Sequence, residues 1–262
     1  MIKQIIILLF VIISLAFNKS NFKKFIPPGT VKINDTLFAD ETEVSNLSWL
    51  EFEYWTCTKY GKNSSEYKAV VPDTLVWRNK ESFNEPYVHN YYRHKAYRNF
   101  PVVGITFEQA IAFCKWRTER VKEFYSIAYK KSLKIEYKLP SKEQWEFISN
   151  LGSGVFHNKG KNEKGLITFN HRWAKDSVEW IKGDKNRIGM DVTAPVYSYW
   201  PNSFHLYNMI GNVSEMVLEK GISKGGSWRN ILEECRVGKD IPYEKPSAML
   251  GFRCICIFKL KN

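Results

Sequence analysis

The chain has 262 residues, of which 44% are hydrophobic, 15% aromatic and 25% charged. This composition supplies enough apolar material for one sizeable core, and it excludes an intrinsically disordered protein. The formal net charge is +12. Such a charge is typical of a basic solvated surface, or of attraction to an anionic partner such as an outer-membrane glycolipid, a cell-wall polymer or an acidic protein. The basic residues are scattered rather than gathered in one motif, which argues against a nucleic-acid partner.

The first residues have the pattern of a targeting segment. Lys3 gives a short positive start, and an almost unbroken apolar run extends from Ile5 to Phe17. A helix of that length spans only about 20 Å, short of the roughly 30 Å hydrocarbon core of a bilayer. A cleaved signal peptide over residues 1–18 is therefore favoured over an uncleaved anchor. Because no cysteine precedes Cys57, we find no lipobox, and we expect export to the periplasm or cell envelope.

Three helices are predicted from apolar spacings of three and four and from capping residues. The first begins at Ser45–Asn46 and runs toward Gly61, the second begins at Thr106 with Gln109 as its capping-box partner and reaches Ala128, and the third begins at Ser141 with Gln144 and ends before Gly152.

The chain after Gly152 is punctuated by glycine, proline and asparagine, which predicts loops that join short strands. We expect two of these strands at Val192–Tyr199 and Cys254–Phe258. No linker or repeat interrupts residues 27–262. The prediction is one α+β domain of low regular secondary-structure content, filled by large aromatic rings.

Five cysteines, at positions 57, 114, 235, 254 and 256, show no zinc-type spacing. Cys254 and Cys256 have the strand spacing that points both side chains to one face. An exported chain permits disulfides, and the odd total leaves at least one free thiol. The aromatic runs at 91–100 and 197–200 are candidates for a recognition surface or for core packing, and packing is favoured.

The segment Lys224–Asn230, with Cys235 five residues later, resembles the core of the formylglycine-generating-enzyme (sulfatase-modifying factor) family. Further blocks match that family in order: Pro28–Thr30, Asp40–Asn46, Pro101–Trp116, Lys138–Phe147, Leu206–Glu215 and Gly251–Cys254. The resemblance implies the fold of that family, which is distantly like that of C-type lectins.

The resemblance also bears on catalysis. Two cysteines bind copper and carry out the oxidation in catalytic members, but here Asn230 holds the first position and only Cys235 the second. Soft thiolates select Cu(I) and a carboxamide does not, so copper is not expected and Cys235 is interpreted as the remnant of the site. We therefore expect a non-catalytic scaffold or binding protein. The alternatives are a metal-dependent oxidoreductase with a rearranged site around Cys235, and a carbohydrate-binding module.

Two further features follow from the resemblance. In catalytic relatives the positions of Asn208, Gly211, Val213 and Glu215 hold a structural calcium ion, and oxygen ligands of these types suit Ca²⁺. The relatives also join two segments covalently, which implies a disulfide between Cys114 and Cys254.

One group of segments resembles a particular branch of the family. Val71–Trp77, Asn84–Val88 and Tyr91–Tyr97 are similar to the K- and J-type gliding-motility lipoproteins of Bacteroidetes. That resemblance implies association with gliding motility and type IX secretion at the periplasmic side of the outer membrane. The expected partners are secretion or motility membrane proteins, or cell-envelope glycans.

Overall fold

A computed structural model describes residues 25–78, 84–130, 132–151, 168–172 and 192–258. Four strands form one antiparallel sheet in the order β1-β2-β8-β3. They are β1 at Thr30–Lys32, β2 at Leu37–Asp40, β3 at Ile135–Lys138 and β8 at Ile255–Phe258. A second sheet has the order β6-β5-β4-β7, with β4 at Ser214–Met216, β5 at Ile222–Lys224, β6 at Ile241–Pro242 and β7 at Leu250–Gly251.

The helices confirm the three sequence predictions within one or two residues. They are α2 (Asn46–Tyr60), α5 (Phe107–Tyr129) and α6 (Lys142–Asn150), and both predicted capping boxes are formed. The structure adds two short α-helices, α3 (Ser65–Ala69) and α4 (Glu85–Asn90), and two 3₁₀ turns, η1 (Thr74–Trp77) and η2 (Lys95–Tyr97). The prediction of an α+β fold is therefore correct.

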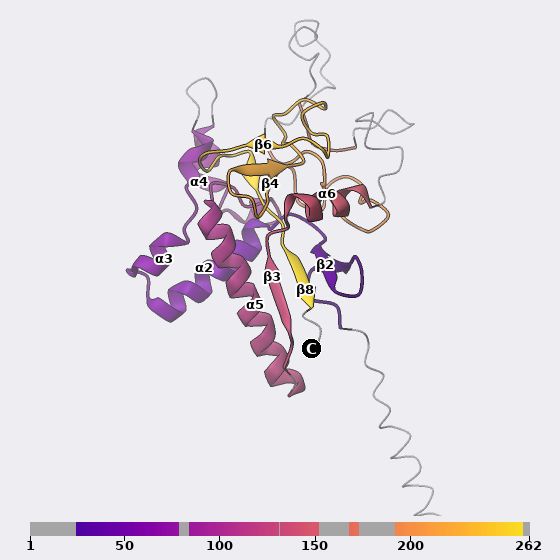
Figure 1. Cartoon of the computed structure of the whole chain (residues 1–262). Coiled ribbons are helices and arrows are strands. Elements are labelled where there is room, and N and C mark those ends of the chain that lie inside the picture. Colours follow the sequence, from indigo (N-terminus) through magenta and orange to yellow (C-terminus); the bar gives the residue numbers. More distant parts are fainter. Residues whose placement is uncertain (1–24, 79–83, 131, 152–167, 173–191, 259–262) are drawn as a thin grey trace, which may run out of the picture.

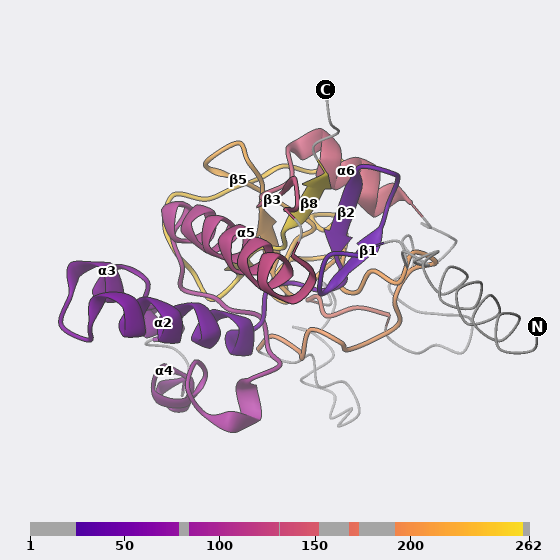
Figure 2. The same cartoon turned by 90° about the horizontal axis from the view of Figure 1, so that it is seen from below.

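Helices cover both faces of the first sheet. Helix α5 packs on the face that carries Phe38 and Cys256, and α6 packs on the opposite face, with Leu37, Ala39 and Ile255. Figure 1 shows α5 running alongside β3, and Figure 2 shows α2, α3 and α4 together beyond α5, away from β1 and β2. The core between α2 and α5 is built of rings. Trp49 stacks on Phe113 with ring centroids 5.4 Å apart, and Phe252 meets both rings edge-on. Ring pairs of this kind stabilise a core beyond the area they bury.

The strand expected at Val192–Tyr199 is not formed, and this prediction was wrong. The segment is irregular, because the side chain of Asn212 bonds both the backbone N–H of Ala194, at 2.7 Å, and its carbonyl, at 3.2 Å. A side-chain amide thus takes the place of a partner strand. The strand expected at Cys254–Phe258 is confirmed one residue shorter, since the N–H of Cys254 donates to the carboxylate of Asp40 instead.

The aromatic run at 91–100 belongs mostly to the interior. Tyr91 and Tyr92 are 1% and 4% exposed. The second run differs, because Tyr197 and Trp200 are 57% and 59% exposed. Among the described residues, no helix has both the length and the apolar character needed to cross a membrane.

Candidate functional site

The glycine turn after β5 is shaped by contact with Cys235. Gly225 and Gly226 have φ values of +84° and +72°, a region that side-chain-bearing residues rarely adopt. A Cβ atom on Gly226 would come within 2.4 Å of the Cys235 sulfur. The two glycines therefore let the turn lie directly against Cys235.

The side chain of Asn230 is occupied by hydrogen bonds within this turn. Its carbonyl oxygen accepts from the backbone N–H of Ser227, at 3.0 Å, and from the Ser227 hydroxyl, at 2.6 Å. Its amide nitrogen donates to the carboxylate of Glu234, at 3.0 Å. Asn230 thus closes the turn as a structural residue, and both ends of its side-chain amide are engaged there.

Cys235 is a buried thiol rather than a reactive one. Its sulfur is 3.9 Å from the backbone oxygen of Asn230, and the residue packs with Phe169 and Ile210. Burial, together with the carboxylates of Glu234 and Glu233, raises the pKa of the Cys235 thiol to about 12. Since the thiolate is the form that binds copper and attacks, this cysteine is held in its inert form.

The residues at this turn do not fit a copper ion. One thiol with a raised pKa and one engaged carboxamide cannot supply the two thiolates that Cu(I) requires. Among the described residues, no three histidine, cysteine, aspartate or glutamate side chains come together in a set that could hold a metal ion.

A buried ion pair joins Glu215, on β4, to Arg253, which lies between β7 and β8. Glu215 and Arg253 are each 1% exposed. Arg253 donates through Nε at 2.7 Å and 2.9 Å and through Nη2 at 2.6 Å to the Glu215 carboxylate, which also accepts from the indole N–H of Trp145 at 2.7 Å. A fork of this kind fixes both partners, and breaking it would leave an uncompensated buried charge.

A second buried carboxylate, Glu43, adjoins that pair. The amide nitrogens of Asn208 and Asn212 donate to its two oxygens, at 3.1 Å and 2.8 Å. Burial raises the pKa of Glu43 to about 7, an effect that the charge of Arg253 opposes and the charge of Glu215 reinforces. Both carboxylates therefore lie in the field of the Arg253 guanidinium, and of the two, among the described residues, only Glu215 forms an ion pair with it.

The predicted calcium ligands lie on the segment from Asn208 to Glu215, and they fit the ion in part. The Oδ1 atom of Asn208 is buried and has no hydrogen-bond partner among the described residues, as expected of an oxygen that awaits a cation. The carboxylate of Glu215, in contrast, already accepts four hydrogen bonds, which matches its full capacity. An ion at Asn208, Gly211 and Val213 would have to compete with Arg253 for Glu215, and calcium binding stays a prediction.

Cys114 and Cys254 lie face to face in the main core. Their sulfur atoms are 3.5 Å apart and unbonded in the structure. The segments predicted to be linked are therefore adjacent, and the disulfide itself stays a prediction. Cys254 and Cys256 belong to the same core cluster, as their spacing indicates.

The family is decided by comparison with known proteins. A family model of the sulfatase-modifying factor enzyme 1-like domain matches residues 14–257. This chain belongs to the sulfatase-modifying factor family. Its fold is shared by Treponema denticola variable protein 1 (TM-score 0.51, 16% identity, covering 88% of this chain and 92% of that chain) and by CarF (TM-score 0.53, 15% identity, 88% and 96%).

Catalytic and inactive proteins are both among the family members similar to this chain. The formylglycine-generating enzyme of Mus musculus is 28% identical over 205 residues, which are 76% of this chain and 45% of that protein. The inactive C-alpha-formylglycine-generating enzyme 2 of Bos taurus is 28% identical over 172 residues, 59% and 50% of the two chains. The chain thus spans about half the length of these relatives, and identity alone does not separate the two kinds.

The buried cluster of Glu43, Asn212 and Arg253 was missed by sequence reasoning. Each of the three lies inside a segment that was recognised as family-like, yet none was assigned a role. Only Arg253 carried a local signal, because it stands between Phe252 and Cys254, and a charged residue among apolar neighbours is buried only with partners.

Proposed function

We propose that this protein is an exported, non-catalytic scaffold or binding protein of the sulfatase-modifying factor family. The observation that carries the proposal is the engagement of Asn230 by Ser227 and Glu234 at the position of a copper-binding cysteine. The buried, protonated thiol of Cys235 adds support. The similarity to proteins named inactive is in agreement with it.

The test is an oxidase assay with copper and a sulfatase-type cysteine peptide, read by mass spectrometry. We expect no formylglycine from the natural chain, and conversion by it would overturn the proposal. The Asn230→Cys variant is the matched partner, since it restores a second thiol beside Cys235. We expect this variant to bind Cu(I) more tightly than the natural chain, because two thiolates then become available.

The runner-up, an oxidoreductase rearranged around Cys235, makes a different prediction for bound metal. Elemental analysis of untagged protein from its native host separates the two. Stoichiometric copper or iron supports the oxidoreductase, whereas calcium alone supports a scaffold with an ordered turn. The unpartnered Oδ1 atom of Asn208 is the observation that supports including calcium in the proposal.

We further propose that the protein acts at the periplasmic side of the outer membrane, with gliding-motility and type IX secretion proteins. The support is the sequence resemblance of Val71–Tyr97 and the apolar segment at residues 5–17. Deletion of the protein in its native host should impair colony spreading and secretion through that system. Normal spreading and secretion, or recovery of the protein only in the cytosol, would contradict this part.

A further inference from the structure

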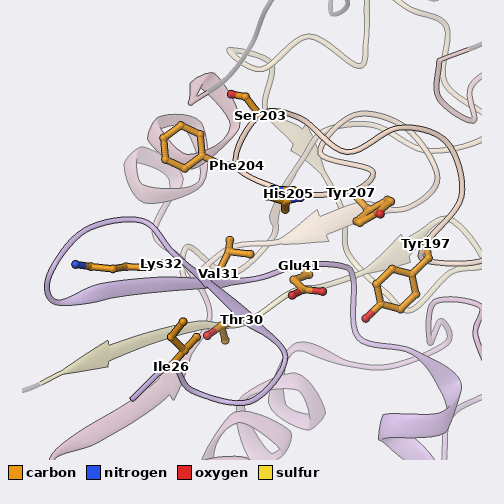
Figure 3. Close-up of a pocket in the computed structure, with 10 residues that line it drawn as sticks. All are labelled: Ile26, Thr30, Val31, Lys32, Glu41, Tyr197, Ser203, Phe204, His205 and Tyr207. Atoms are coloured by element: carbon orange, nitrogen blue, oxygen red, sulfur yellow. The ribbon is translucent and has the colours of Figure 1, made fainter. Parts of the chain in front are cut away.

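A hollow of about 550 Å³ opens on the face of the molecule where β1 meets the loop that precedes β4. Its walls come from Ile26, from β1, from Glu41 just after β2, from Tyr197, and from Ser203, Phe204, His205 and Tyr207 (Figure 3). That volume lies in the range of ligand-binding clefts. None of the family's copper or calcium positions lines it.

One end of the hollow combines two aromatic rings with a carboxylate. Tyr197 and Tyr207 meet at 77° with ring centroids 5.3 Å apart, so they form two walls of a corner. The N–H of Tyr207 donates to the backbone oxygen of Glu41 at 2.8 Å, which holds Glu41 beside that corner. Figure 3 shows the Glu41 side chain next to Tyr197. Ring faces and a carboxylate together attract a cation.

The negative charge of Glu41 is not balanced within the described residues. Glu41 is half-buried, and no described side chain donates to its carboxylate or forms an ion pair with it. Lys32 also lines the hollow, but its side chain points away from Glu41 in Figure 3, and its ammonium group pairs with Asp35 at 2.5 Å. A cation brought by a ligand would therefore meet an unmatched carboxylate.

The hollow also has an apolar part, away from the two tyrosines. Ile26, which is 55% exposed, Val31 and Phe204 line this part, and the polar side chains of Thr30 and Lys32 lie beside them (Figure 3). A peptide with a basic side chain and an apolar neighbour would match both ends. A sugar hydroxyl would also donate to the carboxylate of Glu41, but it carries no positive charge, so a cationic ligand and its neutral isostere distinguish the two kinds of ligand.

The walls are held in place before any ligand arrives. The side-chain oxygen of Asn202 accepts from the N–H groups of Phe204, at 2.9 Å, and Leu206, at 3.0 Å. The guanidinium of Arg253 donates to the backbone oxygen of Tyr207 at 2.8 Å. A rigid wall loses little conformational entropy on binding, which favours affinity.

We propose that this hollow binds an extended segment of a partner protein, with an arginine or lysine side chain against Glu41 and the two tyrosines and an apolar side chain at the Ile26 end. The inference rests on the proposed binding role and names the chemistry of the partner. It does not depend on the glycine turn, so failure of the hollow and failure of the oxidase argument are separate results.

The test is a double-mutant cycle between the full chain and a short peptide. The probes are acetylated and amidated Leu-Ser-Arg and the same peptide with citrulline, a neutral residue of the same shape as arginine. Binding is followed by NMR of labelled tyrosine rings. Glu41→Gln removes the carboxylate charge and keeps its shape. Glu66→Gln, an exposed carboxylate on α3, is the matched control.

We expect the natural chain and Glu66→Gln to bind the arginine peptide about five- to tenfold more tightly than the citrulline peptide, as for a partly desolvated charge pair with ring contacts. In Glu41→Gln the two peptides should bind equally. Tyr197→Ala should weaken the arginine peptide without unfolding the chain, since this ring is 57% exposed. Equal binding of both peptides by the natural chain, no binding of either, or binding of N-acetylglucosamine oligomers that depends on Glu41 would overturn the proposal.

Discussion

The buried carboxyl of Glu43 makes the stability of this protein depend on pH in a direction opposite to that of most carboxylates. Glu43 is 1% exposed, and burial raises its pKa from 4.5 to about 7. Below about pH 4.5 the group is protonated whether the chain is folded or not, so its contribution to stability is complete. As the pH rises through about 7, the folded state must accept a buried charge, and that contribution is lost.

The size of the effect follows from the pKa itself. A change from 4.5 to about 7 corresponds to about 3 kcal/mol, at 1.36 kcal/mol for each pKa unit. The Glu43→Gln variant has no ionisable group at this position, so this share of the pH dependence should disappear. The amide nitrogen of the new side chain would face Asn208 or Asn212 donor to donor, which lowers stability by about 1–3 kcal/mol at every pH. The slope with pH is therefore the informative quantity.

The assay is urea unfolding at several values between pH 5 and pH 8, in EDTA. The free energy of unfolding of the natural chain should fall by about 2.5 kcal/mol more than that of Glu43→Gln across this range, because part of the effect lies below pH 5. The exposed Glu66→Gln variant should follow the natural chain. If the natural chain and Glu43→Gln differ in slope by less than about 1 kcal/mol over the range, Glu43 is not a buried acid of raised pKa, and the reasoning is refuted.

Two further predictions concern the glycine turn and the core cysteines. Gly226→Ala should lower the free energy of unfolding by about 3 kcal/mol or more, because the turn needs a positive φ and the new methyl group would collide with Cys235. The control is Gly238→Ala, where a Cβ atom meets nothing within 4 Å, and it should change stability by less than about 0.5 kcal/mol. Thermal unfolding measures both variants. For Cys114 and Cys254, thiol labelling of the unfolded, unreduced chain should modify three of the five cysteines, and reduction should lower stability by up to about 5 kcal/mol, since the bridge closes a very long loop. Labelling of all five would contradict the pairing.

The helices were predictable because their signals are local. Thr106 with Gln109 and Ser141 with Gln144 satisfy the free N–H groups at a helix start, whatever the rest of the fold does. The family assignment was predictable for a similar reason, since each matching block is a short run of residues. The four short strands of the second sheet were not predicted, because two- or three-residue strands carry no clear alternation of polar and apolar residues.

The candidate site divides in the same way. Asn230 in place of a cysteine is visible in the sequence alone, and so is the spacing to Cys235. Only the structure shows that Asn230 is used to close its turn, and that Glu215 is taken by Arg253, 38 residues away. The local amino-acid sequence thus determined the helices, the family and the absence of the first copper-binding cysteine. Tertiary packing decided which side chains share a partner, because the pairing of buried charges depends on contacts between segments that are distant in the chain.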